Sequence, residues 1–321
     1  MLSYIYLAHW LTMDFLTVFF VLPTASSYST RINIFFFYMT WTTLVMSHSA
    51  LRLELYGTLL ARLVFYILPS LLFLAFDLAA PGTASSFKER GESGLPTGSA
   101  RSKPTLKELK IAGWSLLNVT LSLTAQLLIE TLFLKTNLKP AVQMSLSIPM
   151  PWNITKQLFW GFLLREALSY TIHRFILHSR LPVFSFIANL HKTWYHSLQH
   201  TGPFPLTAHY DHPLAYMLLG FIPMYLPVLF MRFHMITFLV YTVLISIEEC
   251  FAFSGYYVLP SFVLSATARR MEGHLVGGGK GIFGRWGLID LVVGTGGDGG
   301  GGAGGSGYGD ANGRNGSVKR R

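Results

Sequence analysis

The chain has 321 residues, of which 51% are hydrophobic and only 12% are charged. A soluble domain carries about 25% charged residues, so this composition argues against a water-soluble protein. The net charge is +10, but the basic residues flank apolar runs, where lipid headgroups and membrane orientation account for them without a nucleic-acid partner. The single cysteine, Cys250, excludes an internal disulfide framework and a multi-cysteine zinc site.

Apolar stretches recur along the chain, with lengths near the roughly 20 residues that a helix needs to cross a bilayer. In chain order they are 4–22, 33–48, 59–78, 111–134, 156–172, 214–231 and 235–253. The last two form a hairpin around Arg232 and His234. The pattern predicts an all-α, polytopic membrane protein built as a helical bundle.

Two polar stretches divide the chain. Residues 81–110 are rich in Gly, Ser and Pro and hold six Lys or Arg against three Glu, which predicts a flexible basic loop. The Gly-rich tail, 296–321, cannot bury enough apolar surface to offset backbone entropy, so we expect it to be disordered. The remaining parts are N-terminal membrane helices, 1–80, and a main helical region, 111–295.

Loop charge predicts the orientation in the membrane. Basic loops favour the cytosolic side, which places 81–110 there. Segment 111–134 then runs to the lumen and 156–172 returns, so the chain that follows and the C-terminus are expected to be cytosolic. In that topology the sequon Asn153-Ile154-Thr155 faces the lumen, whereas Asn118 lies inside the bilayer.

Histidines are concentrated in one part of the chain. Seven of the eleven fall within forty residues, and one more follows the final hairpin. Histidine is costly beside lipid and marks function where it clusters, and neutral imidazole is a common metal ligand. The candidate ligands of a cytosolic, histidine-rich metal cap are His173, His178, His191, His196, His200, His209, His212 and His274.

The spacing of these histidines sets a condition on local structure. His196 and His200 are four residues apart and share one helical face. His173 and His178 are five apart, as are His191 and His196. Two side chains at that spacing reach one ion only through a π-bulge or a helix end.

The chain then resembles the fatty acid hydroxylase/sterol desaturase superfamily, most of all its fungal members. The resemblance covers about 155–295 closely and the N-terminal part loosely. It rests on the order His173-Arg174, His178, His191-Lys192, Tyr195-His196, Ala208-His209-Tyr210-Asp211-His212-Pro213, Glu248, Ser254-Gly255-Tyr256, Pro260, Gly287, Asp290 and Gly294-Thr295.

The resemblance implies a multi-pass enzyme of the endoplasmic reticulum membrane. Members hold two non-haem irons with histidines from HxxxH, HxxHH and HxxHH boxes. They use oxygen, with electrons from cytochrome b5 or an NAD(P)H-dependent reductase, to hydroxylate or desaturate lipids. Region 111–295 would then be catalytic, with iron as cofactor and a sterol or long acyl chain as substrate. Which lipid, which position and which of the two reactions do not follow from the sequence.

The boxes depart from the family pattern. Box one, His173 and His178, is one residue longer, and box two, His191 and His196, has Trp194 and Tyr195 where a histidine is usual. Box three keeps only His274, with Arg270 and Gly273 in place of two histidines. The residues that could replace lost ligands or orient the imidazoles are His200, His209, Asp211, Glu248 and Glu272.

Several alternatives stay open. Glu248 either orients a ligand or forms a salt bridge with Arg174 or Arg269, and Glu272 either binds metal or pairs with a neighbouring arginine. Trp194 and Tyr195 line a substrate channel or belong to the aromatic belt of the membrane. With box three degraded, the centre holds two metals, one or none. A member without activity would bind lipid or act as a scaffold. A zinc hydrolase ranks last because no HExxH motif is present.

Overall fold

The computed structural model describes residues 28–99, 103–259 and 261–296, and within them every regular element is a helix. This confirms the predicted all-α class. The predicted segment 4–22 and residues 297–321 of the predicted tail lie outside the described residues.

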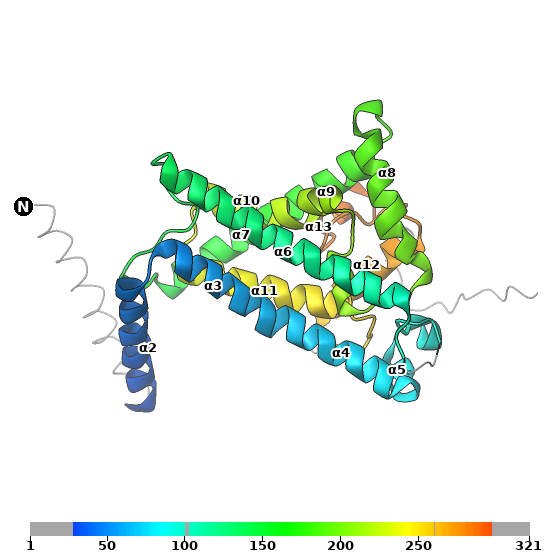
Figure 1. Ribbon diagram of the computed structural model, residues 1–321, viewed down its shortest axis with the longest axis horizontal. Coiled ribbons are helices and arrows are strands. Elements are labelled where there is room, and N and C mark those ends of the chain that lie inside the picture. Colours follow the sequence, from blue (N-terminus) through cyan, green and yellow to red (C-terminus); the bar gives the residue numbers. More distant parts are fainter. Residues whose placement is uncertain (1–27, 100–102, 260, 297–321) are drawn as a thin grey trace, which may run out of the picture.

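Long helices run side by side along the molecule and form a bundle (Figure 1). Helix α2 (Tyr28–Ser47) diverges from the bundle at one end. The bundle consists of α3 (Ala50–Arg62), which continues through the π-helical turn η2 (Leu63–Ile67) into α4 (Leu68–Ala79), together with α6 (Leu106–Lys135), α7 (Pro151–Ile172), α10 (Ile222–Met231) and α11 (Met235–Ala252).

Four helical stretches are long and apolar enough to cross a membrane: Ala50–Ala79, Leu106–Lys135, Pro213–Met231 and Met235–Ala252. They correspond to four of the predicted segments, and the chain is a polytopic helical membrane protein. The predicted segments 33–48 and 156–172 are also helical, within α2 and α7, but neither is among these four. In α7 the reason is visible in the sequence, because Lys156, Arg165 and Glu166 interrupt the apolar run.

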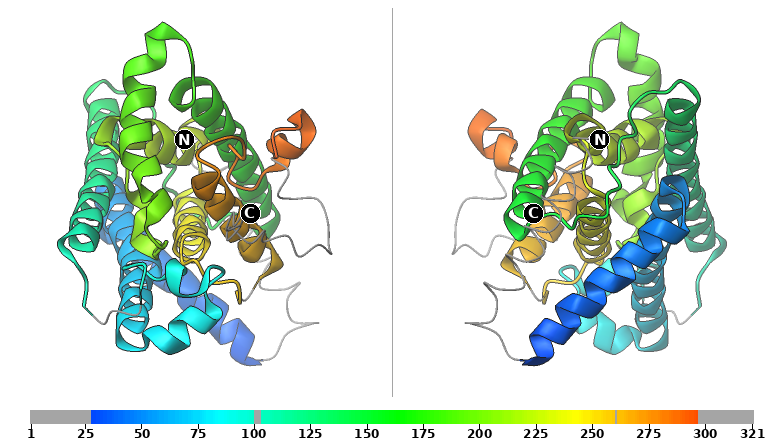
Figure 2. Two further views of the ribbon diagram at one scale, coloured as in Figure 1. Left: turned by 90° about the vertical axis from the view of Figure 1, so that its right-hand side faces the viewer. Right: turned by 90° about the vertical axis from the view of Figure 1, so that its left-hand side faces the viewer.

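Helix α11 occupies the middle of the bundle. Of its most apolar window 61% is buried, against 22% for Ala50–Ala79 and for Leu106–Lys135. In the left view of Figure 2 it is seen nearly end-on in yellow, with the other helices around it. The outer helices instead expose large apolar side chains such as Leu72 and Leu128, as expected of surfaces that face lipid.

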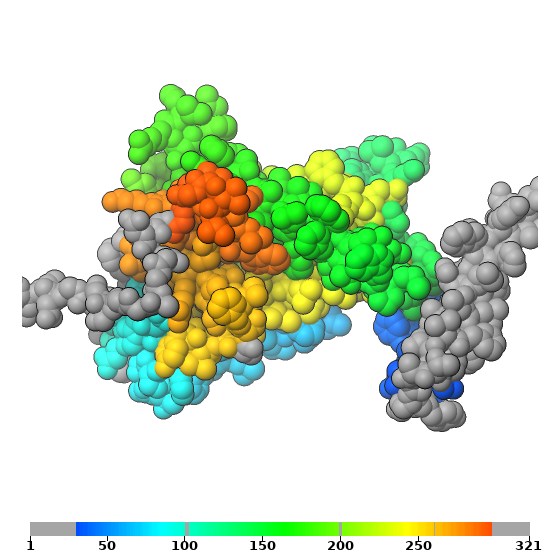
Figure 3. Space-filling model, turned by 180° about the vertical axis from the view of Figure 1, so that it is seen from behind, coloured from blue at the N-terminus to red at the C-terminus, as the bar shows by residue number. Residues whose placement is uncertain are grey.

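Short helices gather at one end of the bundle and form a cap. The cap contains α5 (Pro81–Phe87), η3 (Gly91–Gly94), η4 (His173–Leu177), η5 (Pro182–Phe184), α8 (Ser185–Trp194), η6 (Tyr195–His200), η7 (Pro205–His209), α9 (Pro213–Tyr216) with the π-helical η8 (Met217–Phe221), α12 (Phe262–Val276) and α13 (Leu288–Val293). Figure 3 shows α12 and α13 at the same end as the cyan segment around α5, opposite α2. The basic segment and the histidines therefore share one end, as the predicted topology requires.

The described part of the expected flexible loop, residues 81–99, is folded onto the cap. Lys88 is buried and forms an ion pair with Asp77 at 2.8 Å, and it donates a hydrogen bond to the carbonyl of Ser254 at 2.6 Å. Arg90 pairs with Glu272 at 2.6 Å. The composition of this segment is that of a loop, but its charged side chains find partners in α4 and α12.

Candidate metal centre

Five histidines meet in the cap. His173, His178, His191 and His274 each offer one ring nitrogen, and these four atoms lie within 4.8 Å of one another. His196 completes the cluster, because its Nε2 atom is 3.2 Å from Nε2 of His178 and its ring is 5.1 Å from that of His274. Two ring nitrogens at 3.2 Å need either a proton on one of them or an ion held by both.

The first two ligands come from one π-helical turn. η4 begins at His173, where α7 ends, and the amide of His178 donates to the carbonyl of His173 at 2.9 Å. A π-turn holds one more residue than an α-turn, so side chains five apart return to the same face. The π-bulge that the spacing required is present.

The other three histidines come from helix ends. His191 lies in the last turn of α8, and His196 follows in η6, where the chain tightens from α-helix to 3₁₀-helix. His274 lies in the last turn of α12. The helix end between His191 and His196 is the second solution that their spacing allowed, and their ring centroids are 5.2 Å apart.

Three of the imidazoles are oriented by hydrogen bonds from their Nδ1–H groups. His173 donates to the carbonyl of Phe283 at 2.9 Å and His274 to the carbonyl of Gly281 at 2.7 Å. His191 donates to Oδ2 of Asp211 at 2.6 Å. Such partners fix the tautomer and leave Nε2 as a bare lone pair.

The lone pairs that result are buried and unpartnered. Among the described residues no hydrogen-bond partner reaches Nε2 of His173, His191 and His274 or Nδ1 of His196, and these atoms are buried. A buried acceptor without a partner costs about 1–3 kcal/mol. Several such atoms in one cluster fit a metal ion, which would bind these lone pairs.

Four of the five clustered imidazoles are neutral at physiological pH. Burial lowers the pKa of His178 to about 3, of His196 to about 2 and of His274 to about 4, and neighbouring imidazoles add to the effect. Burial likewise holds the pKa of His173 well below its usual value. Neutral imidazole is the form that binds metal.

A segment after α12 closes over the cluster. Gly279 has a φ of +78°, and a Cβ atom there would lie 2.4 Å from Cε1 of His178. Only glycine combines this backbone conformation with the close approach to the ring. The segment then supplies the two carbonyls, of Gly281 and Phe283, that orient His274 and His173.

Two buried carboxylates hold this segment in place. Glu166 of α7 accepts hydrogen bonds from the amides of Trp286 at 2.9 Å and Leu288 at 3.1 Å. Asp290 accepts from the amides of Phe283 and Gly284, and it pairs with Arg270 at 2.8 Å. The sequence indicates Asp290 only through the family resemblance, and it carries no signal for Glu166.

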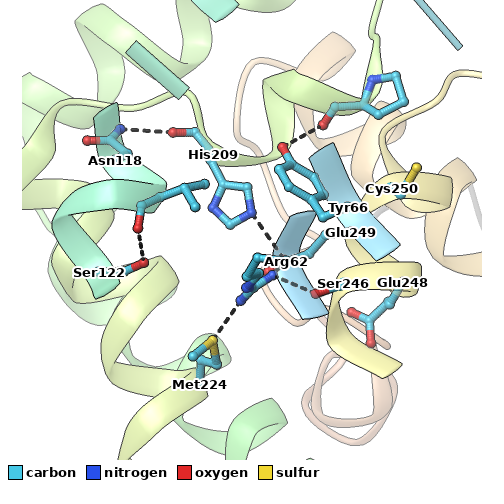
Figure 4. Close-up of polar contacts among 12 residues, drawn as sticks. Arg62, Tyr66, Asn118, Ser122, His209, Met224, Ser246, Glu248, Glu249 and Cys250 are labelled. Carbon is cyan, nitrogen blue, oxygen red and sulfur yellow. Dashed lines mark hydrogen bonds and ion pairs between the residues drawn. The ribbon is translucent and has the colours of Figure 1, made fainter. Parts of the chain in front are cut away.

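His209, one of the predicted ligands, lies in a separate network inside the bundle (Figure 4). Its Nε2 atom is 3.1 Å from Glu249 and its Nδ1 atom is 2.8 Å from the hydroxyl of Tyr216, so both ring nitrogens are occupied. Glu249 also forms an ion pair with the buried Arg62 at 2.5 Å. His209 is a buried structural histidine in this geometry, not a replacement ligand.

The remaining candidates also have other partners. His212 accepts a hydrogen bond from the amide of Leu214 and caps α9, whereas Asp211 accepts one from His191 and orients that imidazole. Glu272 pairs with Arg90, whereas the neighbouring Arg270 pairs with Asp290. His200 ends η6, and its side chain lies outside the described residues.

Glu248 forms the predicted salt bridge, but with a different arginine. Its carboxylate accepts from Arg165 of α7 at 2.9 Å and from the indole of Trp286 at 3.1 Å. Arg174 instead donates to the hydroxyl of Tyr170, and Arg269 lies 4.0 Å from Glu89. The sequence gives no reason to pair Glu248 with Arg165, because the two residues are 83 positions apart.

Two openings reach the cluster from different directions. A narrow cavity of about 30 Å³ begins at His173 and extends to Leu219 in the membrane span Pro213–Met231. An open cleft on the other side is lined by His178, His196 and Lys192. Tyr195 lines the narrow cavity, and its ring stacks on that of His191 with the ring centroids 5.0 Å apart, whereas Trp194 packs on Trp114 of α6.

Comparison with known proteins agrees with this geometry. No solved structure matches the chain significantly. Residues 158–295 match the family model described as fatty acid hydroxylase, and this range holds the five clustered histidines, Asp211 and the closing segment. Residues 158–295 are therefore a domain of the fatty acid hydroxylase/sterol desaturase superfamily.

Proposed function

We propose that the protein is a membrane-bound, non-haem iron oxidoreductase that uses oxygen to hydroxylate or desaturate a lipid, either a sterol or a long acyl chain. The observation that carries the proposal is the cluster of buried imidazole nitrogens without partners. The narrow cavity connects this cluster to a membrane span, so an apolar substrate has a route from the bilayer.

The chain's own residues prepare the site. His173, His178, His191, His196 and His274 would hold the metal, and iron bound there would supply the redox chemistry that activates oxygen. Asp211 keeps the proton of His191 on Nδ1, and the carbonyls of Gly281 and Phe283 do the same for their histidines. Burial of His173, His191 and His274 excludes bulk water from their side of the cluster.

The number of donors favours one iron over the two that the resemblance implies. Two ions with about four ligands each would need eight donors, and five imidazoles converge in the described part of the chain. Arg270 stands in the third box at a position usual for a ligand, but its guanidinium pairs with Asp290. A cationic side chain cannot coordinate a metal.

We further propose that the enzyme lies in the endoplasmic reticulum membrane with its cap in the cytosol. Two features support this orientation: the basic segment and the histidines share one end, and that segment carries Lys88 and Arg90. Electrons would come from cytochrome b5 or an NAD(P)H-dependent reductase. The open cleft at His178 and His196 offers a donor an approach separate from the lipid cavity.

A second candidate is a family member that binds lipid or scaffolds an enzyme complex without catalysis. The ion pair between Arg270 and Asp290 favours it, because it fills a ligand position with a structural contact. Metal content separates the two candidates. We expect the detergent-purified protein to contain about one iron per chain, and to consume oxygen when it receives electrons and lipid.

The control is His234→Ala, because His234 caps α11 far from the cluster and its loss should leave iron content unchanged. Protein without iron, or with iron that is retained in His191→Ala, would overturn the oxidase proposal and favour the lipid-binding candidate.

A further inference from the structure

The narrow cavity beside the metal cluster contains an arginine without a partner. The cavity is bounded on one side by His173 and on the other by apolar side chains that lead to the membrane span. Arg285, from the segment that closes over the cluster, reaches the same cavity. Arg285 and His173 line the same small cavity, so a group bound by Arg285 lies close to the metal ligands.

Three other arginines form ion pairs with carboxylates, and Arg285 differs from them. Arg90, Arg165 and Arg270 form ion pairs with Glu272, Glu248 and Asp290. These three pairs have nitrogen–oxygen distances from 2.6 to 2.9 Å. Among the described residues Arg285 has neither an ion pair nor a hydrogen bond, although it is partly buried.

The cavity has one carboxylate of its own, and that carboxylate is occupied. Asp211 uses Oδ2 to orient His191 and Oδ1 to accept the amide of His212. It therefore holds a ligand in place and forms no ion pair with Arg285 among the described contacts. A partly buried guanidinium whose N–H donors have no acceptor is stabilised by an anion that accepts hydrogen bonds from them.

A second polar group faces the same space. The hydroxyl of Tyr195, stacked over His191, has no hydrogen-bond partner among the described residues and lines the cavity. Burial raises the pKa of the Tyr195 phenol, and the positive charge of Arg285 acts on it in the opposite direction. Tyr195 and Arg285 line the same cavity, so one bound ligand can contact both side chains.

We propose that Arg285 binds the carboxylate of a long-chain acyl substrate, with the Tyr195 hydroxyl as a second donor and the acyl chain extending past Leu219 into the membrane. A guanidinium matches a carboxylate in a two-bond geometry that an ammonium does not offer. The position of oxidation rests on the proposed function. The carbons next to the carboxylate lie beside His173, so oxidation occurs near the carboxylate end of the acyl chain. Arg285 is a positioning residue.

The test compares binding of palmitate and of hexadecanol, which has the same chain length but no charge, to the purified metal-loaded protein in lipid nanodiscs. We expect the wild type to bind palmitate about tenfold tighter or more, as a charge-assisted hydrogen bond predicts. Arg285→Gln should remove this preference, and Arg285→Lys should keep part of it. Arg180→Gln is the matched control, because Arg180 is exposed on the cap outside the cavity, and its preference should equal that of the wild type.

Metal content is measured in the same samples, so the two proposals can fail separately. Equal binding of palmitate and hexadecanol by the metal-loaded wild type, or a preference that persists in Arg285→Gln, would overturn the assignment of Arg285 and leave the metal centre intact. A wild type that prefers palmitate through Arg285 but binds no iron would keep the carboxylate site and overturn the oxidoreductase.

Discussion

The amide of His178 donates to the carbonyl of His173 across a π-helical turn, and this single bond makes the two imidazoles neighbours with ring centroids 4.9 Å apart. In a regular α-helix residues five apart differ by about 140° around the axis and face away from each other. The metal cluster therefore depends on a local departure from α-helix at the point where α7 leaves the bundle for the cap.

Substituting a clustered histidine should weaken metal binding, whereas substituting His209 or His212, which the structure places elsewhere, should not. His191→Ala and His274→Ala remove a lone pair from the cluster, so we expect metal affinity to fall about 100-fold or more, beyond the 10–100-fold typical of an outer-shell partner. His212→Ala loses only a helix cap and should bind metal like the wild type.

The measurement is metal titration against a chelator of known affinity, with far-UV circular dichroism to confirm folding. His209→Ala is the informative comparison, because sequence spacing grouped it with the ligands. If it lost metal as fully as His191→Ala, the ligand set derived from the geometry would be wrong.

Two adjacent glycines provide a matched pair for the closing segment. Gly278 and Gly279 both have positive φ, +63° and +78°, so alanine is strained at either position. Only at Gly279 would the new Cβ meet the ring of His178, whereas nothing lies within 4 Å at Gly278. We expect Gly279→Ala to weaken metal binding at least tenfold more than Gly278→Ala, with a similar loss of thermal stability. Equal metal affinities would show that the segment does not set the position of His178.

The sequence predicts the parts of this protein that depend on local pattern. Run lengths identify all four candidate spans, and the five-residue spacing of His173 and His178 requires the π-turn that is present. The contact between Asp211 and His191 follows from the need to orient a ligand. Each of these rests on periodicity or on the chemistry of a nearby residue.

The sequence does not predict the contacts that a side chain makes with residues far away in the chain. Main-chain carbonyls such as that of Gly281 orient ligands but leave no trace in residue identity. His209 resembles a ligand because of its neighbours along the chain, but Glu249, 40 residues away, occupies its ring nitrogen. Lys88 lies in a segment with loop composition and is nevertheless buried, because Asp77 provides its counter-charge.

The buried pair between Arg62 and Glu249 should stabilise the bundle only as a pair. Arg62→Met leaves a carboxylate in the interior without its cation, which typically costs about 3–5 kcal/mol. The double variant Arg62→Met, Glu249→Gln removes the charge as well, so we expect it to be less destabilised than Arg62→Met alone. Denaturation midpoints measured in the same detergent give the loss of stability in the single and the double variant. Additive losses in the double variant would contradict an interaction between the two side chains.

Removing the metal should make stability depend on pH. The pKa of His178 is lowered to about 3 and that of His274 to about 4, mainly by burial, whereas unfolded histidine titrates near 6.5. Between pH 6.5 and about 4 the unfolded chain thus binds protons that the folded cluster does not, and stability falls as pH falls. Above pH 6.5 this effect should vanish. Melting temperatures of chelator-treated protein, measured from pH 8 to 5, give the dependence of stability on pH. His274→Gln should make this dependence weaker. An unchanged dependence in that variant would contradict the lowered pKa of His274.

The orientation in the membrane can be read from glycosylation. Asn153 is exposed in the first turn of α7, at the end of the bundle from which α7 runs toward the cap. If the cap is cytosolic, the sequon at Asn153 faces the lumen and should be modified in cells, with a mobility shift that endoglycosidase removes and Asn153→Gln abolishes.

Gly91→Asn creates the acceptor sequence Asn-Glu-Ser at the cap end, and its positive φ of 57° is one that asparagine tolerates. In an Asn153→Gln background this site should stay unmodified. Modification there would invert the topology, place the histidine cluster in the lumen and remove cytosolic electron carriers from consideration, because soluble cytosolic donors cannot reach that side of the bilayer.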